Sequence, residues 1–442
     1  MLSRRAPLLV LLMTTAAFTA TACSPPGLAT VVTRGDAITR LDVEGHDSTG
    51  APITPDTPMR VASITKSFTA AGVLTLVDEG RVDLDRPLVT YVPDFRMADA
   101  RAAAITVRHL LNQTSGLADY TVDIGATQRA TDLAAYVAAL RPGVLTAPPG
   151  TRYAYCNVNY DLAARLIEVV DGRPFAEAMR ARVFAPLGMT DTAIGTTPAD
   201  GYNSLFGWWV ARRELAGFRG GAGGAVTTAR DMGRWLVSQT GHGGLLSAAS
   251  RREMQTPGKV ASGYAMGWGP VDVAGRTLLV HSGNLFTYTA VQAIDPDTGE
   301  GWAVLTNSAA LGDPTYETLL TLVGNTEVSR SERPLVEAGL AATAIVSVLL
   351  ATIGVRRGRR PRRLWRLVPP LIPVVVFVTT PQWISMLTNG RTVTWAQMTY
   401  FPAPLTAALA VVALAGLVTF LARLRAVWAV SLSGHGGSDG SV

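Results

Sequence analysis

The chain has 442 residues, a net charge of +6, 48% hydrophobic residues and only 16% charged residues. This excess of apolar residues favours a membrane protein over a purely soluble one. Seven arginines lie between residues 356 and 366, and the rest of the chain is close to neutral. The positive charge is therefore a local topology signal, and it does not indicate a nucleic-acid partner.

The first 23 residues have the order of a secretory signal peptide. Arg4 and Arg5 come first, an apolar stretch follows, and Ala20-Thr-Ala-Cys23 ends the segment with small residues. Small residues directly before Cys23 resemble a bacterial lipobox, in which the thiol is lipidated; the alternative is an ordinary signal peptide that is cut near this point. The only other cysteine is Cys156, so we expect no disulfide framework in the exported domain.

Residues 24–326 are predicted to form one domain, which begins with a hairpin at residues 30–43. The next element is a helix that starts at Ser63 and ends at Gly80, because apolar residues recur there at helical spacing. Further helices are expected near residues 107–112, 130–140, 159–171, 174–184, 228–238 and 246–254.

Strands return near the end of this domain, at residues 277–281, 286–294 and 302–306, and a final helix is expected at 313–324. Because strands stand at both ends of the domain with helices between them, we expect the two ends to share one antiparallel sheet. The predicted fold class is therefore α+β, with an antiparallel sheet flanked by helices and an inserted helical region.

Three apolar stretches follow a linker at residues 327–337, and each is near or above the length that crosses a bilayer. They are predicted to be transmembrane helices at about residues 338–355, 367–389 and 402–422, within a membrane region of 338–425, with a tail at 426–442. The second contains four prolines, so we expect kinks in it. The arginine-rich loop at 356–366 is expected in the cytoplasm, which places the large domain on the extracytoplasmic side.

The first motif that carries chemistry is Ser63-Ile-Thr-Lys66. The chain has 37 arginines but only two lysines, so a lysine three residues after a serine is informative. Residues three apart lie on one face of a helix, which would place an amine one turn above the Ser63 hydroxyl. A nucleophile would then lie beside its own base.

Two further motifs have a use if they converge on Ser63. Tyr155-Cys-Asn157 lies in a loop before a helix, where Tyr155 could pass a proton and Asn157 could bind a substrate amide. His281-Ser-Gly283 ends a strand, and Gly283 would let the backbone approach the acyl group, so that the amide of Asn284 could donate to an oxyanion. Taken singly, a Tyr-x-Asn is usually a solvated turn and a His-x-Gly a strand end.

The chain resembles the class C β-lactamase-related serine hydrolases, a family of D,D-peptidases, penicillin-binding proteins, D-amino-acid peptidases and esterases. The resemblance extends from about residue 31 to 325 and includes the three motifs. The further matching segments are PDTPMRVAS at 55–63, ITVRHLLNQTSGL at 105–117, PLGMT at 186–190, YAMGW at 264–268 and LTNS at 305–308.

The resemblance implies a role for each residue of the three motifs. Ser63 would be the acylated nucleophile, with Lys66 and Tyr155 as the acid/base pair. The substrate-binding residues would be Asn157, His281, Ser282, Gly283 and Asn284, with the main-chain amides of Ser63 and Asn284 forming the oxyanion hole. Gln113 would border the cleft, and we expect it to have a structural role.

Two departures from the family pattern bear on the substrate. His281 stands where classical β-lactamases have lysine, and a histidine is mostly neutral at pH 7, so efficient penicillin hydrolysis is not expected. Cys156 replaces the usual serine, and we expect it to be a small packed residue. A D,D-peptidase or esterase activity is therefore favoured over an efficient β-lactamase.

The sequence as a whole predicts a membrane-anchored extracytoplasmic serine hydrolase that forms an acyl-serine on an amide or ester. A D-amino-acid peptide or a related substrate is favoured. The alternative is a penicillin-binding sensor or interaction protein with little turnover. No cofactor and no metal are expected, because His109 and His242 lack paired ligand spacing. The sequence leaves the oligomeric state open.

Overall fold

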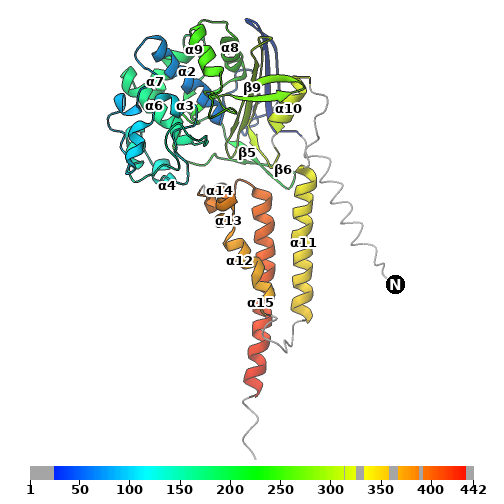
Figure 1. Ribbon diagram of the computed structural model, residues 1–442. Helices are drawn as coiled ribbons and strands as arrows, with labels where there is room; N and C mark the ends of the chain where they lie inside the picture. The colour runs from blue at the N-terminus through cyan, green and yellow to red at the C-terminus, as the bar shows by residue number, and fades with distance from the viewer. Residues whose placement is uncertain (1–23, 313, 325–332, 358–366, 388–391, 435–442) are drawn as a thin grey trace, which may run out of the picture. The chain divides into compact units, whose positions relative to one another are not determined.

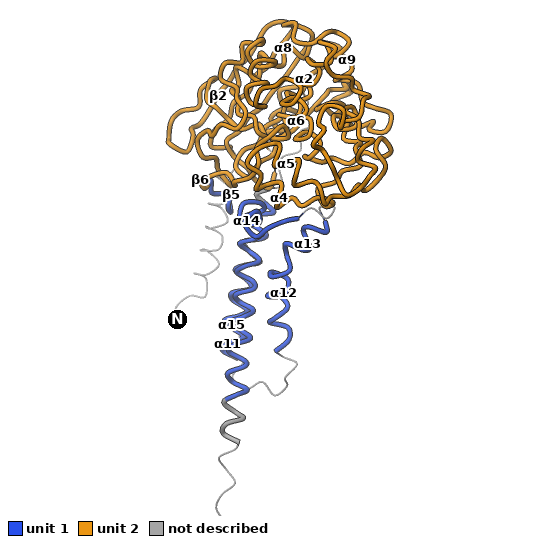
Figure 2. The backbone as a smooth tube through the Cα atoms, turned by 90° about the vertical axis from the view of Figure 1, so that its left-hand side faces the viewer, with its two compact units in different colours: residues 1–24, 204–209, 331–442 blue, residues 25–203, 210–330 orange. Residues whose placement is uncertain are grey.

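The computed structural model describes residues 24–312, 314–324, 333–357, 367–387 and 392–434. The chain divides into two compact units, which are described separately below (Figure 2). Unit 1 comprises residues 1–24, 204–209 and 331–442, and unit 2 comprises residues 25–203 and 210–330. The predicted signal peptide, Cys23 and most of the arginine-rich loop lie outside the described residues.

Unit 2 contains a six-stranded antiparallel sheet to which both ends of the unit contribute (Figure 1). The first strand of the chain pairs with the last long one, so that Leu28 lies opposite Thr306. The shared sheet expected from the sequence is thus present. Its strands, in spatial order, are β2 (Ala37–Gly45), β1 (Gly27–Arg34), β11 (Glu300–Thr306), β10 (Thr289–Asp295), β9 (Arg276–Asn284) and β8 (Gly269–Val273).

Helices cover both faces of this sheet, so its central strands are apolar on both sides. In β11, Ala303 and Leu305 pack into the main core, where α8 (Ala229–Gln239) contacts the sheet. Trp302 and Val304 point to the other face, where α10 (Pro314–Leu322) covers them. Successive side chains of a strand alternate between faces, which explains the unbroken apolar run in β11.

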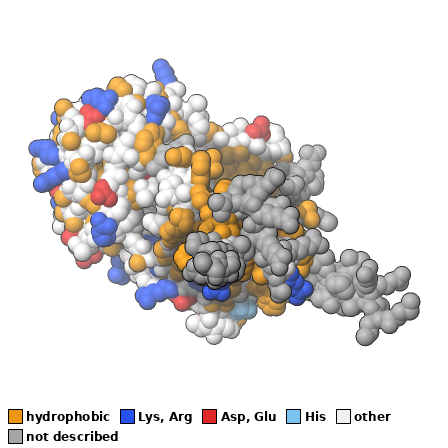
Figure 3. Space-filling view, turned by 90° about the horizontal axis from the view of Figure 1, so that it is seen from below, with side chains coloured by type: hydrophobic (Ala, Val, Ile, Leu, Met, Phe, Trp, Pro, Cys, Tyr) orange, Lys and Arg blue, Asp and Glu red, His pale blue; other side chains and the backbone are white. Residues whose placement is uncertain are grey.

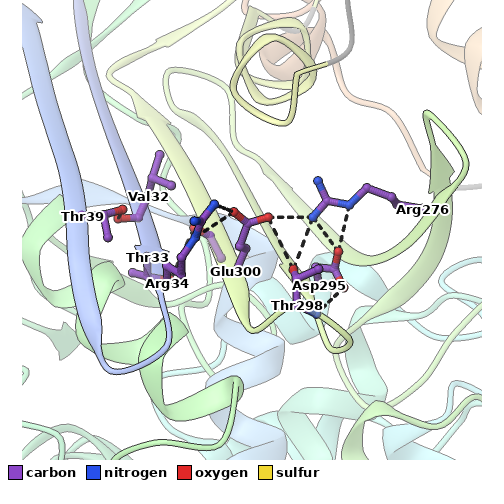
Figure 4. Close-up of polar contacts among 9 residues, drawn as sticks. Val32, Thr33, Arg34, Thr39, Arg276, Asp295, Thr298 and Glu300 are labelled. Carbon is purple, nitrogen blue, oxygen red and sulfur yellow. Dashed lines mark hydrogen bonds and ion pairs between the residues drawn. The ribbon is translucent and has the colours of Figure 1, made fainter.

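The ends of several strands are joined by a network of charged side chains (Figure 4). Arg276 of β9 forms ion pairs with Asp295 of β10 and Glu300 of β11, at 2.6 and 2.8 Å. Arg34 of β1 reaches the same Glu300 from the other side. Because Arg34 is largely exposed, we expect this part of the network to weaken at high salt.

The helical region surrounds α2 (Thr65–Asp78), which is buried along most of its length. Phe68 packs edge-on against Trp235 of α8, with ring centroids 4.8 Å apart. A helix that is apolar on most sides is typical of a core position. The other long helices of this unit are α6 (Asn157–Asp171), which contacts α2, and α9 (Ala248–Gln255). Shorter helices are α3 (Val107–Leu111), α4 (Ile124–Gln128), α5 (Leu133–Ala139) and α7 (Phe175–Met179).

Several elements differ from the sequence prediction. The helix expected to start at Ser63 begins with a separate 3₁₀ turn, Ala62–Ile64, before α2. The strand expected from residue 286 starts at Thr289. The helix expected at 174–184 is α7 followed by a π-helical turn, Arg180–Phe184. Two small sheets were not predicted. One contains, in spatial order, β3 (Met59–Arg60), β7 (Ala225–Thr227) and β4 (Ala193–Ile194). The other contains β12 (Ser308–Ala309), β5 (Gly201–Leu205) and β6 (Trp208–Arg212).

Unit 1 holds the C-terminal helices, whose exposed side chains are largely hydrophobic (Figure 3). Two stretches, Leu335–Arg356 and Ala403–Trp428, are long and apolar enough to cross a membrane. A third would be the pair Pro369–Val378 and Thr380–Leu387, which is bent by 57° in the region where the sequence predicts kinks. The helices are α11 (Arg333–Arg357), α12 (Ile372–Val378), α13 (Thr380–Leu387), α14 (Trp395–Met398) and α15 (Ala403–Gly434).

Two helices extend beyond the predicted membrane region of 338–425. α11 begins at Arg333, within the predicted linker, and α15 continues to Gly434, within the predicted tail. Within this unit α15 packs closely on the preceding segment, because a Cβ at Gly416 would lie 2.3 Å from the carbonyl oxygen of Pro370.

Candidate active site

Ser63 lies in the turn between β3 and α2, in a backbone conformation that is held in place by its neighbours. Ala62, directly before it, has a φ of 46°, a left-handed conformation that is uncommon for a residue with a side chain. The Ser63 hydroxyl has two partners, one of them three residues further along the chain and the other 92 residues further along. Lys66 Nζ lies 2.9 Å from Ser63 Oγ, and the Tyr155 hydroxyl lies 3.0 Å from it.

Lys66 is fully buried, and its three contacts fix its position. Besides Ser63 Oγ, Nζ donates to Asn157 Oδ1 at 2.9 Å and to the carbonyl oxygen of Ala222 at 2.8 Å. An ammonium has three donors, so the site satisfies all of them. When Lys66 is a neutral amine, its Nζ can accept one hydrogen bond instead of donating it. Of its three partners, only the Ser63 hydroxyl carries a proton that it can donate.

Tyr155 and Asn157 are placed by the start of α6. Tyr155 precedes this helix and is 41% exposed, so it borders solvent. Lys66 Nζ lies 4.9 Å from the centroid of its ring. Asn157 is the first residue of α6, and its oxygen is used by Lys66, which leaves its NH₂ group available to a substrate carbonyl.

Gly283 brings the end of β9 against the turn that carries Ser63. A Cβ at this position would lie 2.1 Å from the carbonyl oxygen of Val61 and 3.2 Å from Ala62 Cβ. No other residue fits without a backbone movement. Asn284, the last residue of β9, pairs with Thr289 of β10, so the strand end beside Ser63 is fixed within the sheet.

His281 is buried and neutral. Its Nδ1 lies 2.7 Å from the carbonyl oxygen of Ser282, so this nitrogen carries the hydrogen, and Nε2 accepts from the Tyr264 hydroxyl at 3.2 Å. Burial, and then the charge of Lys66, lower the pKa of His281 to about 4. The histidine expected from the sequence to be mostly neutral is therefore uncharged at pH 7.

A cluster of aromatic rings beside His281 was not predicted as part of the site. Tyr264 lies at its centre, with ring centroids 5.8 Å from His281, 6.1 Å from Tyr155 and 5.9 Å from Tyr153. Tyr153 and Tyr155 are both partly exposed, so these rings line an apolar surface next to Ser63. Tyr153 and Tyr155 are two positions apart in an extended segment, so their side chains lie on the same face. This spacing is the sequence signal that could have indicated the aromatic cluster.

Gln113 and Cys156 support the site without reaching Ser63. Gln113 Oε1 accepts from the Cys156 amide at 3.0 Å and from Asn159 Nδ2 at 2.6 Å, so it fixes the segment that holds Tyr155. This is the structural role expected for Gln113. Cys156 is fully buried with its Sγ 3.2 Å from Asp119 Oδ1, and burial raises the pKa of its thiol. It is a packed residue, as predicted.

Asp161 is a buried acid behind Lys66 that sequence reasoning missed. Its Oδ1 accepts from the amide of Ala222 at 3.1 Å, and the carbonyl of the same residue accepts from Lys66. Burial raises the pKa of Asp161 to about 6. Asp161 lies one helical turn after Asn157, on the same face of α6, and this spacing was the signal that could have identified it.

Among the described residues, no group of three or more histidine, cysteine, aspartate and glutamate side chains is arranged to hold a metal ion. The contacts of Ser63 Oγ suit this atom to acyl transfer. Lys66 and Tyr155 are within proton-transfer distance of this atom, and the strand end at Gly283 stands beside it.

Comparison with known proteins agrees with this chemistry. Residues 19–324 match the family model described as Beta-lactamase. The chain belongs to the beta-lactamase family, and it is a serine hydrolase of that family with the β-lactamase/transpeptidase α+β fold.

Among its relatives is Penicillin-binding protein 4 of Amycolatopsis lactamdurans, which is 31% identical over 296 residues, covering 59% of this chain and 75% of the relative. Protein flp of Staphylococcus aureus (strain COL) is 27% identical over 267 residues, covering 57% of this chain; the chain thus spans about half of the flp length. The solved D-amino acid amidase of Ochrobactrum anthropi SV3 is 28% identical with a TM-score of 0.57, covering 73% of this chain and all of the amidase.

Proposed function

We propose that this protein hydrolyses an amide or ester through an acyl-serine at Ser63, and that D-amino-acid peptides or amides are its substrates. One observation carries the proposal: Ser63 Oγ lies 2.9 Å from Lys66 Nζ and 3.0 Å from the Tyr155 hydroxyl. A serine with two proton-transfer partners at this distance is an activated nucleophile.

In the proposed first step, Ser63 Oγ attacks the substrate carbonyl carbon and its proton passes to the pair formed by Lys66 and Tyr155. The amides of Ser63 and Asn284 stabilise the oxyanion, and the Asn157 NH₂ group holds a substrate carbonyl. Tyr155 then returns a proton to the leaving group. In the second step water attacks the acyl ester, and the same pair takes up and returns its proton.

The surroundings of His281 support an uncharged leaving group. With a pKa of about 4 this histidine offers no positive charge to a carboxylate at pH 7, and its neighbours Tyr153 and Tyr264 are aromatic. The similarity to a D-amino acid amidase supports the same choice. Efficient β-lactam hydrolysis is correspondingly not proposed, and His281, Ser282 and Gly283 are assigned to the substrate-binding wall.

A second candidate is a penicillin-binding sensor or interaction protein with little turnover. The similarity to Penicillin-binding protein 4 favours it. It uses the same acylation step at Ser63 and differs only in how fast the acyl group leaves.

We further propose that the protein is anchored in the cell membrane, with the hydrolase domain on the extracytoplasmic side. The two or three long apolar helices support this location, and the arginines at 356–366 support the orientation. Removal of residues 1–23 as a signal peptide and lipidation of Cys23 belong to the same proposal. Protease treatment of intact cells tests it, because an outward-facing domain is digested and an inward-facing one is protected.

The function itself is tested with the full-length protein in detergent and with Ser63→Ala. A fluorescent penicillin and a fluorophosphonate should label the parent and fail to label the variant. D-Phenylalanine amide and L-phenylalanine amide then serve as a matched substrate pair. Turnover with preference for the D form supports the hydrolase, whereas stable labelling without turnover supports the penicillin-binding alternative. Equal labelling of parent and Ser63→Ala contradicts both.

A further inference from the structure

The hairpin of β5 and β6 ends in a run of large apolar side chains. These neighbouring strands are joined by a two-residue turn, Phe206 and Gly207. We call the run Leu205-Phe-Gly-Trp-Trp209 the aromatic tip. None of its residues is buried, and Trp208 is 73% exposed. A contiguous exposed apolar surface commonly marks contact with another protein or with a membrane.

The turn of the aromatic tip has a backbone conformation that disfavours an aromatic residue. Phe206 has a φ of 49° and Gly207 a φ of 84°. Hairpin turns in which both central residues have positive φ normally use asparagine or aspartate followed by glycine, because these residues adopt it at low cost. A bulky residue there is an outlier, and such outliers concentrate where a side chain takes part in binding. The position of Phe206 therefore favours a binding role for its side chain.

Glu337 ties the aromatic tip to the beginning of a candidate membrane span. It lies near the start of Leu335–Arg356, and only 4% of its surface is exposed. Its Oε1 accepts from the Ser204 hydroxyl at 2.8 Å and its Oε2 from the amide of Gly207 at 2.7 Å. A carboxylate in an apolar span is costly unless it is hydrogen-bonded, and the hairpin supplies these bonds. The aromatic tip therefore lies beside the start of the span, within unit 1 (Figures 1 and 2).

The aromatic tip also holds the residue that follows the predicted lipidation site. The Trp209 indole nitrogen donates to the carbonyl oxygen of Ser24 at 2.9 Å. Ser24 directly follows Cys23 in the chain, and an acyl chain on Cys23 would enter the bilayer at the headgroup level. The tip is thus bonded to two points, Ser24 and Glu337, that the proposed anchoring places at the membrane surface.

The chemistry of this surface suits the boundary between lipid headgroups and acyl chains. Leu335 and Val336, at the start of the span, are exposed and extend the apolar surface of the tip. Tryptophan is enriched at membrane–water interfaces, because its ring is apolar and its N–H is polar. The arginines at 356–366 follow the other end of the span and are expected in the cytoplasm. The start of the span is therefore expected on the extracytoplasmic side.

We propose that the aromatic tip is an interfacial anchor, in which Trp208 and Phe206 insert among the lipid headgroups of the extracytoplasmic surface where α11 enters the bilayer. This inference rests on the membrane anchoring proposed above. It adds to the helices a second contact with lipid, made by a hairpin that lies within the sequence of the hydrolase domain.

The depth of Trp208 is measured by the quenching of tryptophan fluorescence with brominated phosphatidylcholine. The full-length protein and Trp208→Phe are reconstituted into vesicles whose lipid is unbrominated, brominated near the headgroup, or brominated near the chain end. The difference between parent and variant isolates the Trp208 signal. It should be quenched strongly by the shallow bromines and weakly by the deep ones, because interfacial side chains lie about 5–10 Å into the headgroup and acyl boundary.

Two further tryptophans serve as matched controls. Trp302 is buried in β11 of unit 2, so its signal, isolated with Trp302→Phe, should not be quenched by either lipid. Trp428 is exposed at the end of the candidate span Ala403–Trp428, so its signal, isolated with Trp428→Phe, should be quenched if this span is in the bilayer.

The role of Glu337 is tested by isolating the Trp208 signal again in Glu337→Ala and Glu337→Gln backgrounds. Glu337→Ala removes both acceptors, so quenching of Trp208 by the shallow bromines should fall. Glu337→Gln keeps one acceptor and should retain part of the quenching. Unchanged quenching in both backgrounds would overturn the role of Glu337 in placing the tip.

The result for Trp428 separates failure of this inference from failure of the membrane proposal. If Trp428 is quenched and Trp208 is not, the interfacial anchor is overturned while the membrane spans stand. If neither is quenched, the proposed membrane anchoring is contradicted and the interfacial anchor falls with it. Quenching of Trp208 that is stronger with the deep bromines would also overturn an interfacial position.

Discussion

Replacing Asp161 by asparagine tests the electrostatics behind Lys66. Asp161 is enclosed within unit 2, and its Oδ1 accepts from the amide of Ala222, whose carbonyl holds Lys66. An asparagine has nearly the same shape and can keep this acceptor. The substitution therefore removes the ionisation and keeps the hydrogen bond to Ala222.

The magnitude follows from the pKa of Asp161, which burial raises from 3.8 to about 6. One pH unit corresponds to about 1.4 kcal/mol, so ionisation of this buried acid lowers the free energy of unfolding by about 3 kcal/mol. Because the pKa is raised, the parent keeps this stability below pH 4 and loses it as the pH rises through 6. The stability of Asp161→Asn relative to the parent should therefore increase by about 3 kcal/mol between pH 4 and pH 7.

Thermal unfolding of the full-length protein in detergent, followed by tryptophan fluorescence between pH 4 and pH 7, measures this change. About 3 kcal/mol corresponds to a relative increase of about 5 °C in the Tm of the variant. Asp272→Asn, at an exposed position on β8, controls for the exchange of a carboxylate for an amide. A difference between Asp161→Asn and the parent that stays constant over this range would refute the reasoning.

Three other substitutions test the site. Tyr155→Phe should lower kcat by about 10²–10⁴ without changing the Tm, because Tyr155 is partly exposed and its hydroxyl serves proton transfer; ester hydrolysis and a melting curve measure both. Gly283→Ala should lower the free energy of unfolding by about 1–3 kcal/mol and reduce activity, because its Cβ meets the Val61 carbonyl, and urea unfolding with a rate assay measures it. His281→Asn should leave the shape of the pH profile of kcat/KM unchanged between pH 5 and 8, because the pKa of His281 is about 4. The neutral form of His281 stabilises the fold, and this stability is lost as the pH falls through the pKa of about 4. Full activity in Tyr155→Phe would contradict the proton-transfer role. Unchanged stability and activity in Gly283→Ala would contradict the steric argument. Loss of an inflection near pH 6 in His281→Asn would contradict the argument from the pKa of His281.

The sequence predicts the main sheet because its strands have strong local signals, whereas the convergence of the three motifs is implied by the resemblance to the class C β-lactamase-related hydrolases. The strands at 277–281 and 302–306 are apolar runs bounded by turns, and Ser63 and Lys66 are one helical turn apart. Strands such as β3 and β7 have only two or three residues, which is too short for any alternation to be read.

The missed parts of the site depend on tertiary contacts. Asp161 looks like an ordinary polar helix residue until the packing of α6 on α2 encloses it. Tyr264 and Tyr153 are more than a hundred positions apart in the chain, and the sheet and loops bring their rings together.

The pairing of β1 with β11 also sets the order of events during synthesis. Leu28 pairs with Thr306, 278 positions later, so at about 5–20 residues per second its partner emerges tens of seconds after it. Throughout that interval one edge of β1 presents open hydrogen-bonding groups, which favour aggregation. The new chain must therefore be protected until residue 306 has emerged, and α11, beginning at Arg333, follows only after the sheet can close.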